Sequence, residues 1–275
     1  MKATEKFNQD GIEVVGHEDI NDEDQRLIET MNKAKMHIGT ATSGRYPKGS
    51  SGNVSSSIPP ATKNINTEQG SDMIFDARGS EVVYNEYMDI VKSGPKEIDS
   101  KSDMAVHRYI GSFYERINTY ARHGQGDLSE YRTAKVKEDI EILDATFDKY
   151  GQPVPQGTEL WRGIGVKSGS SVASMEVGDI CEDKAFQSFS LDMTTAGNFA
   201  RHWDVGDTND PSREMTTGKT VIRAIMSGEE KVIRGSLTER EVIFKRGTKW
   251  QVISKDKMKV GRGTELNIVT VMHHG

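Results

Sequence analysis

The chain has 275 residues, a hydrophobic fraction of 34%, 27 glycines and a formal net charge of -6. These values predict a globular protein of one large domain, or a domain with an appendage, that carries a sizeable irregular portion. The negative charge argues against a binder of duplex nucleic acid that relies on general phosphate attraction, and the single cysteine, Cys181, excludes an internal disulfide and fits a reducing, cytoplasmic setting.

Two parts of the N-terminal region differ in composition. An acidic start and apolar residues at helical spacing predict a helix over 22–38, preceded by an edge segment at Ile12-Glu13-Val14-Val15. From residue 40 to about 71 the chain is rich in Ser, Thr, Gly, Asn and Pro, which indicates a linker or mobile loop. We therefore divide the chain into residues 1–75, a helix plus a flexible segment, and residues 76–275, the main domain.

Apolar residues at helical spacing predict three helices in the first part of this domain. Their ranges are 81–91, 103–121 and 127–150. The aromatic side chains on their apolar faces are expected in the core. Gly94-Pro95 ends the first helix, and Gly151 with two prolines ends the third.

Short apolar runs replace the helical pattern after Pro155 and are typical of strands. The expected strands are 159–164, 185–190, 220–226, 241–246, 249–253 and 266–272, with one helix over 194–203. Helices followed by strands predict an α+β fold with a mostly antiparallel sheet, made of a helical part (76–155) and a strand-rich part (156–275). No apolar run approaches the length of a membrane span, so no membrane contact is expected.

Two polar signals lie within these strands. Arg162 follows Leu160-Trp161, and a charged group at such a place either forms a structural ion pair or binds an anion such as phosphate. Ser188 and Ser190 share one strand face, where a hydroxyl can fix a neighbouring carboxylate, although ordinary sheet serines have the same pattern. They lack the Gly-x-Ser-x-Gly sequence of a hydrolase nucleophile.

The third signal is a pair of carboxylates, Glu239 and Glu241, which begin an alternating apolar segment. On an extended strand they project to one face and Arg240 turns away. Two carboxylates a few ångströms apart separate their pKa values, which suits one ionised group and one proton acceptor. Solvated glutamates on an edge strand are the alternative.

These signals in this order resemble the arginine, serine and Glu-x-Glu signature of mono-ADP-ribosyltransferases of the clostridial-toxin and arginine-specific class. The flanks add to the resemblance, since Phe186-Gln187-Ser188-Phe189-Ser190 is similar to the second motif of that family and Glu241-Val242-Ile243-Phe244 to the third. The resemblance covers roughly residues 100–275. Within the family, the chain looks most like the Alt and Mod enzymes of T-even bacteriophages.

Two positions depart from the family pattern. Phe189 stands between the serines where relatives have threonine, so the middle hydroxyl is missing while the shared serine face is kept. His202 stands where some relatives carry a phosphate-binding arginine. Phosphate binding on that side is therefore open.

The resemblance implies a fold in which N-terminal helices pack on a two-sheet core, and it implies NAD as co-substrate. It places Arg162 on the pyrophosphate, the Gly163 backbone near the carboxamide and Phe199 on the nicotinamide ring. Ser190 and His202 complete the expected cofactor-binding set.

For catalysis, the resemblance implies that ionised Glu241 stabilises an oxocarbenium-like ribose and that Ser188 orients it. Glu239 would orient the guanidinium of an acceptor arginine and take up its proton. No metal is expected, because the histidines are scattered and no ligand cluster is present in the sequence.

The expected activity is transfer of ADP-ribose from NAD to arginine side chains of host proteins, with release of nicotinamide. Two alternatives stay open, an NAD glycohydrolase on the same fold and a phage structural or interaction protein with a vestigial site. The expected acceptor is a host transcription or translation protein, RNA polymerase first, and RNA as acceptor stays open. The expected setting is the host bacterial cytoplasm, and delivery from the virion stays open. The expected oligomeric state is a monomer.

Overall fold

A computed structural model describes residues 12–22, 25, 26, 29, 80–124, 129–164, 172–202, 219–260 and 264–275. Its helices are α2 (Ser80–Ser93), α3 (Ser100–Arg108), the π-helical segment η1 (Tyr109–Phe113), α4 (Tyr114–His123), α5 (Glu130–Tyr150) and α7 (Met193–His202). Its strands are β1 (Ile12–His17), β2 (Gln152–Pro153), β3 (Glu159–Ile164), β4 (Asp179–Asp183), β5 (Gln187–Ser190), β6 (Thr220–Ile225), β7 (Lys231–Arg234), β8 (Glu241–Phe244), β9 (Lys249–Val260) and β10 (Thr264–His273).

The strands hydrogen-bond in the order β1-β4-β9-β10-β6-β3-β5-β8-β7-β2. Among these described strands, β10 and β6 run parallel and the other neighbours run antiparallel. We divide this order into two strand groups, the first from β1 to β3 and the second from β5 to β2. The two groups meet where β3 pairs with β5, through one register pair, Trp161 with Ser190. The predicted α+β fold with a mostly antiparallel sheet is confirmed.

The sequence pattern found six of the strands in the second half of the chain and the edge strand, and it missed three others. The six predicted strands correspond to β3, β5, β6, β8, β9 and β10, and the predicted edge segment forms the edge strand β1. β2, β4 and β7 were not predicted, because β4 and β7 each hold only two apolar residues between charged ends and β2 has two residues. Such strands exist through pairing with neighbouring strands, which for β2 and β4 are distant in the chain.

The predicted helix over 103–121 is divided. α3 and α4 are separated by η1, in which Gly111 has non-helical φ -87° and ψ -140°. A π-type turn inserts a residue into the helical repeat and rotates all later side chains relative to the earlier ones. Phe113, predicted in the core, is accordingly 39% exposed, while Ile117 is fully buried. Tyr131 on α5, also predicted in the core, is 82% exposed.

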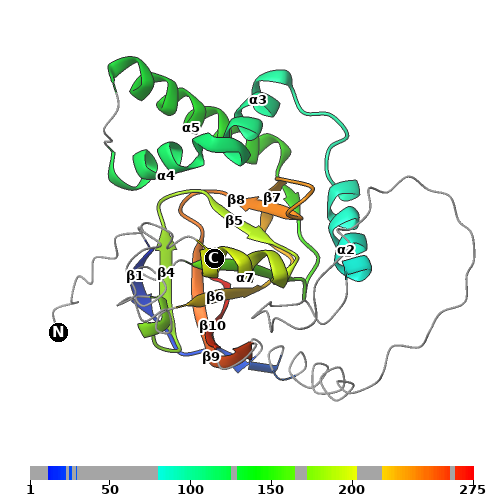
Figure 1. Cartoon of the computed structure of the whole chain (residues 1–275), viewed down its shortest axis with the longest axis vertical. Helices are drawn as coiled ribbons and strands as arrows, with labels where there is room; N and C mark the ends of the chain where they lie inside the picture. The colour runs from blue at the N-terminus through cyan, green and yellow to red at the C-terminus, as the bar shows by residue number, and fades with distance from the viewer. Residues whose placement is uncertain are drawn as a thin grey trace, which may run out of the picture.

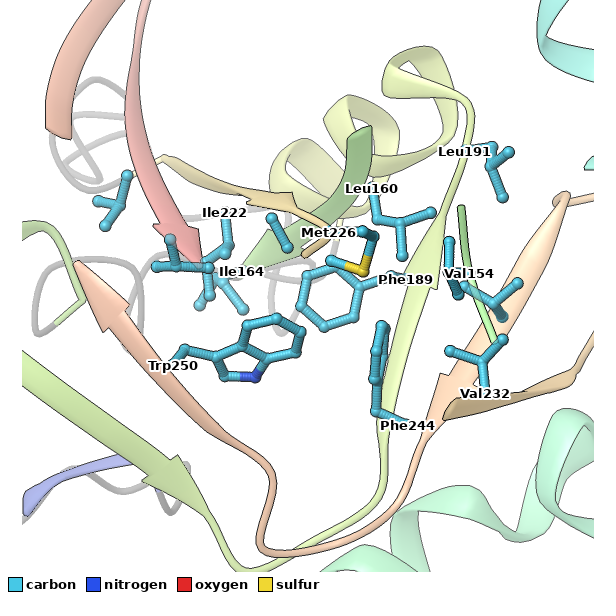
Figure 2. Close-up of a cluster of buried hydrophobic side chains, with 14 of the residues drawn as sticks. Val154, Leu160, Ile164, Phe189, Leu191, Ile222, Met226, Val232, Phe244 and Trp250 are labelled. Atoms are coloured by element: carbon cyan, nitrogen blue, oxygen red, sulfur yellow. The ribbon is translucent and has the colours of Figure 1, made fainter. Parts of the chain in front are cut away.

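The two largest of four buried clusters among the described residues hold most of the fold together. Figure 2 shows the larger one, in which Phe189, Phe244 and Trp250 meet beside Met226. Their ring centroids lie 5.0 to 5.5 Å apart, within the range of favourable aromatic pairs. Each fully buried side chain of this size stabilises the fold by about 1.5–3 kcal/mol.

The second cluster joins the helices to the sheet. It places residues of α3, η1, α4 and α5 against Phe186, Ile233 and Ile243 of the β5-β8-β7 region. In Figure 1, α3, α4 and α5 accordingly lie above β5, β7 and β8. The helix α7 packs mainly against β3. The helices α3, α4 and α5 thus cover the β5-β8-β7 region of the sheet.

The N-terminal region is described in part. Asp22, Gln25, Arg26 and Glu29, within the predicted helix over 22–38, have helical backbone. The predicted linker over 40–71 lies outside the described residues, and the boundary at residue 75 stays a prediction. Within the described ranges, no helix has both the length and the apolar character needed to cross a membrane.

Candidate functional site

A pocket of about 790 Å³ opens where the two strand groups meet, between α7 on one side and η1 and α4 on the other. Seven of the predicted site residues line it, namely Arg162, Gly163, Ser188, Ser190, Phe199, Glu239 and Glu241. The eighth, His202, is the last residue of α7, and its side chain is outside the described residues. The three motifs, far apart in the chain, therefore converge on one cavity.

Gly163 allows α7 to lie directly on β3. A Cβ at this position would stand 2.0 Å from the Ala196 carbonyl oxygen and 2.5 Å from the Ala200 nitrogen, both backbone atoms. Phe199 projects from the same helix, is 36% exposed and lines the pocket. The backbone of Gly163 thus sets how close the Phe199 ring comes to the pocket floor.

We expect Gly163→Ala to displace α7 and to lower the rate of NAD cleavage about tenfold or more, because small displacements of positioning groups have large kinetic effects. The matched control is Gly16→Ala on β1, where the nearest atom to a new Cβ is the Ile180 Cδ1 methyl at 3.3 Å, which can move. Steady-state kinetics and thermal denaturation measure both variants. Equal rates for Gly163→Ala and the parent would contradict this role of the glycine.

Glu241 is the first residue of β8, and its side chain is buried, with 7% exposed. Its Oε2 accepts a hydrogen bond of 2.8 Å from the Ser236 N–H, and the Ser188 hydroxyl donates a second. Burial raises the pKa of Glu241, these two hydrogen bonds lower it in part, and the charge of Glu239 raises it further. The expected contact between Ser188 and Glu241 is present.

Glu239 lies on a turn, and not on the extended strand that the sequence predicted. Residues 237–240 form a turn rather than an extended strand, and Arg240 has a left-handed φ of 49°. The turn, and not strand alternation, places both carboxylates on the pocket wall. Arg240 does point elsewhere, since its Nη1 donates to Asp192 Oδ2 at 2.9 Å.

Ser190 joins the second motif to this turn. Its hydroxyl donates to the Glu239 carbonyl oxygen at 2.6 Å and accepts from the Asp192 N–H at 2.9 Å. Ser190 is buried in the pocket wall, so its hydroxyl fixes backbone as well as lining the cavity. Ser188 and Ser190 thus support Glu241 and Glu239 respectively.

Arg162 belongs to a cluster of three charges. Its Nη2 lies 3.7 Å from Asp183 Oδ2, while Arg122 on α4 holds both oxygens of Asp183 at 3.0 and 2.9 Å. Asp183 is 1% exposed, and both arginines line the pocket. Two guanidinium groups share one carboxylate, so one positive charge is left over. Arg162 can therefore both take part in a structural ion pair and bind an anion, the two alternatives that the sequence left open.

The helical wall adds residues that the sequence reasoning did not select. Tyr109 is buried in η1, and its hydroxyl donates to the Phe186 carbonyl oxygen at 3.1 Å and accepts from Asn118 Nδ2 at 3.2 Å. The Ser188 hydroxyl lies 3.5 Å from the Tyr109 hydroxyl. Burial raises the pKa of Tyr109, which keeps the hydroxyl protonated as a donor. A tyrosine at an apolar helical position gives no sequence signal that separates this role from core packing.

Arg122 was also missed. It closes a helix whose pattern is otherwise amphipathic, and basic residues are common in a last helical turn. Its ion pair with Asp183, 61 positions away, has no local sequence signature.

Among the described residues, no three His, Cys, Asp or Glu side chains gather as a metal-ligating group.

The α+β fold of this chain is that of the ADP-ribosyltransferase toxins. The chain belongs to the ADP-ribosyltransferase exoenzyme family, whose model matches residues 85–273. Among curated protein sequences, none matches the chain.

Solved structures of low sequence identity share the fold. The ADP-ribosyltransferase Vis of Vibrio splendidus in complex with the M6 inhibitor is 20% identical, with a TM-score of 0.53 over 72% of this chain and 86% of that one. The same enzyme in complex with agmatine is 19% identical, with a TM-score of 0.53 over 72% and 87%. The ADP-ribosylating toxin BECa of C. perfringens with NADH is 15% identical, with a TM-score of 0.50 over 71% and 47%.

Proposed function

We propose that the protein cleaves NAD and transfers its ADP-ribose to the guanidinium group of arginine side chains, with release of nicotinamide. The observation that carries this proposal is the buried carboxylate of Glu241, held by Ser188 and the Ser236 N–H inside a pocket that Arg162 and Glu239 also line. Membership of the ADP-ribosyltransferase exoenzyme family supports the reaction type.

Glu241 supplies the electrostatic part of the first step. Departure of nicotinamide leaves positive charge on the ribose, and an ionised carboxylate already oriented by two hydrogen bonds stabilises that charge without reorganising. Phe199, partly exposed on the pocket wall, offers a ring face for the nicotinamide. Gly163 brings backbone amides close to the same region because a Cβ there has no room.

Arg162 and Arg122 offer binding groups for the pyrophosphate. Together with Asp183 they carry one net positive charge on the pocket wall, and planar guanidinium groups match phosphate oxygens. Asp183, almost fully buried, holds the arginines in place while leaving this charge. Arg122 thus supplies a second cation for the phosphates, in place of the arginine that His202 replaces.

Glu239 would act on the acceptor. A guanidinium is protonated at ordinary pH, so a nearby carboxylate is needed to orient it and to receive its proton as the new bond forms. The solved complex of Vis with agmatine, a guanidinium compound, supports an arginine-like acceptor for this chain too. The solved complex of BECa with NADH supports a nicotinamide dinucleotide as donor.

The finer predictions concern setting and partner. A relation to the phage Alt and Mod enzymes, RNA polymerase as first acceptor, RNA as another acceptor, delivery from the virion into the host bacterial cytoplasm and a monomeric state all stay predictions. Water in place of the acceptor would make the protein an NAD glycohydrolase. A phage interaction protein with a vestigial site is disfavoured by the two hydrogen bonds that orient the Glu241 carboxylate in the pocket.

Incubation of the purified protein with NAD and agmatine tests the proposed function. We expect liquid chromatography with mass spectrometry to show nicotinamide together with ADP-ribosyl agmatine. Nicotinamide and free ADP-ribose without the adduct would establish the glycohydrolase instead. No cleavage of NAD would contradict both.

A further inference from the structure

The turn that carries Glu239 has an unusual backbone. Arg240, which separates the two glutamates, has a φ of 49°, a conformation that residues with a side chain adopt unfavourably. Glycine would fit this position without strain, yet the chain has arginine. The surrounding contacts must therefore hold the turn in place.

Those contacts converge on Asp192, at the start of α7. Its Oδ2 accepts from Arg240 Nη1 at 2.9 Å, and both side chains are largely buried. Its Oδ1 accepts from the Thr194 N–H at 2.8 Å, which caps the helix that carries Phe199. Its own N–H donates to Ser190, whose hydroxyl in turn holds the Glu239 carbonyl oxygen.

The backbone completes the attachment. The Leu191 N–H donates to the Arg240 carbonyl oxygen at 3.1 Å, and the Arg240 N–H donates to Leu237 at 3.2 Å. Asp192 is thus joined to the turn both through its side chain and through Ser190. It connects the helix on the NAD side of the pocket to the turn on the acceptor side.

Glu241 depends on other groups. Its carboxylate is held by the Ser236 N–H and by Ser188, and its strand β8 pairs with β5. Loss of the pair between Asp192 and Arg240 should therefore disturb Glu239 more than Glu241.

We propose that Asp192 is a positioning residue that, through Arg240, places the Glu239 carboxylate for the acceptor and so favours transfer over hydrolysis. The inference rests on the proposed function. In transfer, a guanidinium nitrogen bonds to ribose C1′ as nicotinamide leaves, and the guanidinium proton passes to Glu239. In hydrolysis, a water oxygen forms that bond and its proton is released to solvent.

Asp192→Asn is the selective test, because asparagine still caps a helix but replaces the charged oxygen that binds Arg240. With NAD and agmatine, we expect the ratio of ADP-ribosyl agmatine to free ADP-ribose to fall about tenfold, with a raised KM for agmatine and an unchanged KM for NAD. The matched control is Asp144→Asn, which removes a similar ion pair with Arg246 outside the pocket and should keep the parent ratio.

Arg240→Gly separates positioning from stability. Glycine removes the strain of the positive φ, so this variant should melt no lower than Arg240→Gln, and both should lose the transfer ratio to a similar extent. The inference would be overturned if Asp192→Asn or Arg240→Gly gave the same ratio of ADP-ribosyl agmatine to free ADP-ribose as the parent, provided that the parent transfers to agmatine. If the parent forms no adduct, the proposed function itself fails, which is a different outcome.

Discussion

Glu241→Gln is expected to reduce NAD cleavage about 10²- to 10³-fold, measured as nicotinamide release with and without agmatine. The glutamine keeps the size of the side chain and can accept the hydrogen bond from the Ser236 N–H, but it supplies no negative charge beside the developing ribose cation. Hydrolysis and transfer should fall together, because both pass through cleavage of the nicotinamide bond. Cleavage at the parent rate would contradict the role of Glu241.

The same variant should be more stable than the parent at neutral pH. Burial raises the pKa of Glu241 in the folded protein, so the folded state binds this proton more tightly than the unfolded state does. The resulting stability is complete below the ordinary pKa of glutamic acid and is lost as pH rises through the raised folded pKa. The gain in Tm of Glu241→Gln over the parent should therefore be largest at neutral pH and shrink toward acid.

Thermal denaturation of both proteins across a pH series measures this gain. Glu229→Gln, an exposed position outside the pocket, serves as a control that should show no such pH-dependent difference. A Glu241→Gln variant that melts below the parent at neutral pH would show that the ionised carboxylate stabilises the fold. Burial of the Glu241 carboxylate in the pocket would then not lower the stability of the folded protein.

Glu239→Gln is expected to remove transfer to agmatine while leaving cleavage of NAD to ADP-ribose. An amide can still hydrogen-bond a guanidinium, but it cannot receive the proton that leaves as the new bond forms. We expect a loss of transfer of about 10²-fold or more, in the range of general-base removal. Product analysis by mass spectrometry gives transfer and hydrolysis in one measurement.

Two outcomes bear on the assignment of Glu239. Transfer at the parent rate would show that another group receives the acceptor proton. Equal loss of both activities would show that Glu239 acts on the ribose together with Glu241. Glu229→Gln again serves as the control with both activities kept.

The sequence by itself determined the parts of this protein that depend on near neighbours in the chain. Apolar periods predicted α2, α5 and the strands with apolar runs, because alternation and helical spacing reflect which faces are buried. The motifs around Arg162, Ser188 and Glu241 identified the strand side of the pocket wall, because each motif lies within a single strand or at its end. Their convergence followed from the resemblance and not from the local pattern.

The tertiary structure decided what depends on residues distant in the chain. The turn over 237–240 replaced the expected strand because Ser190 and Asp192, almost 50 positions earlier, hold it there. Arg122 became part of the site because it shares Asp183 with Arg162. Hydrogen bonds and ion pairs of this kind form between surfaces that meet after the chain has folded, so no local spacing encodes them.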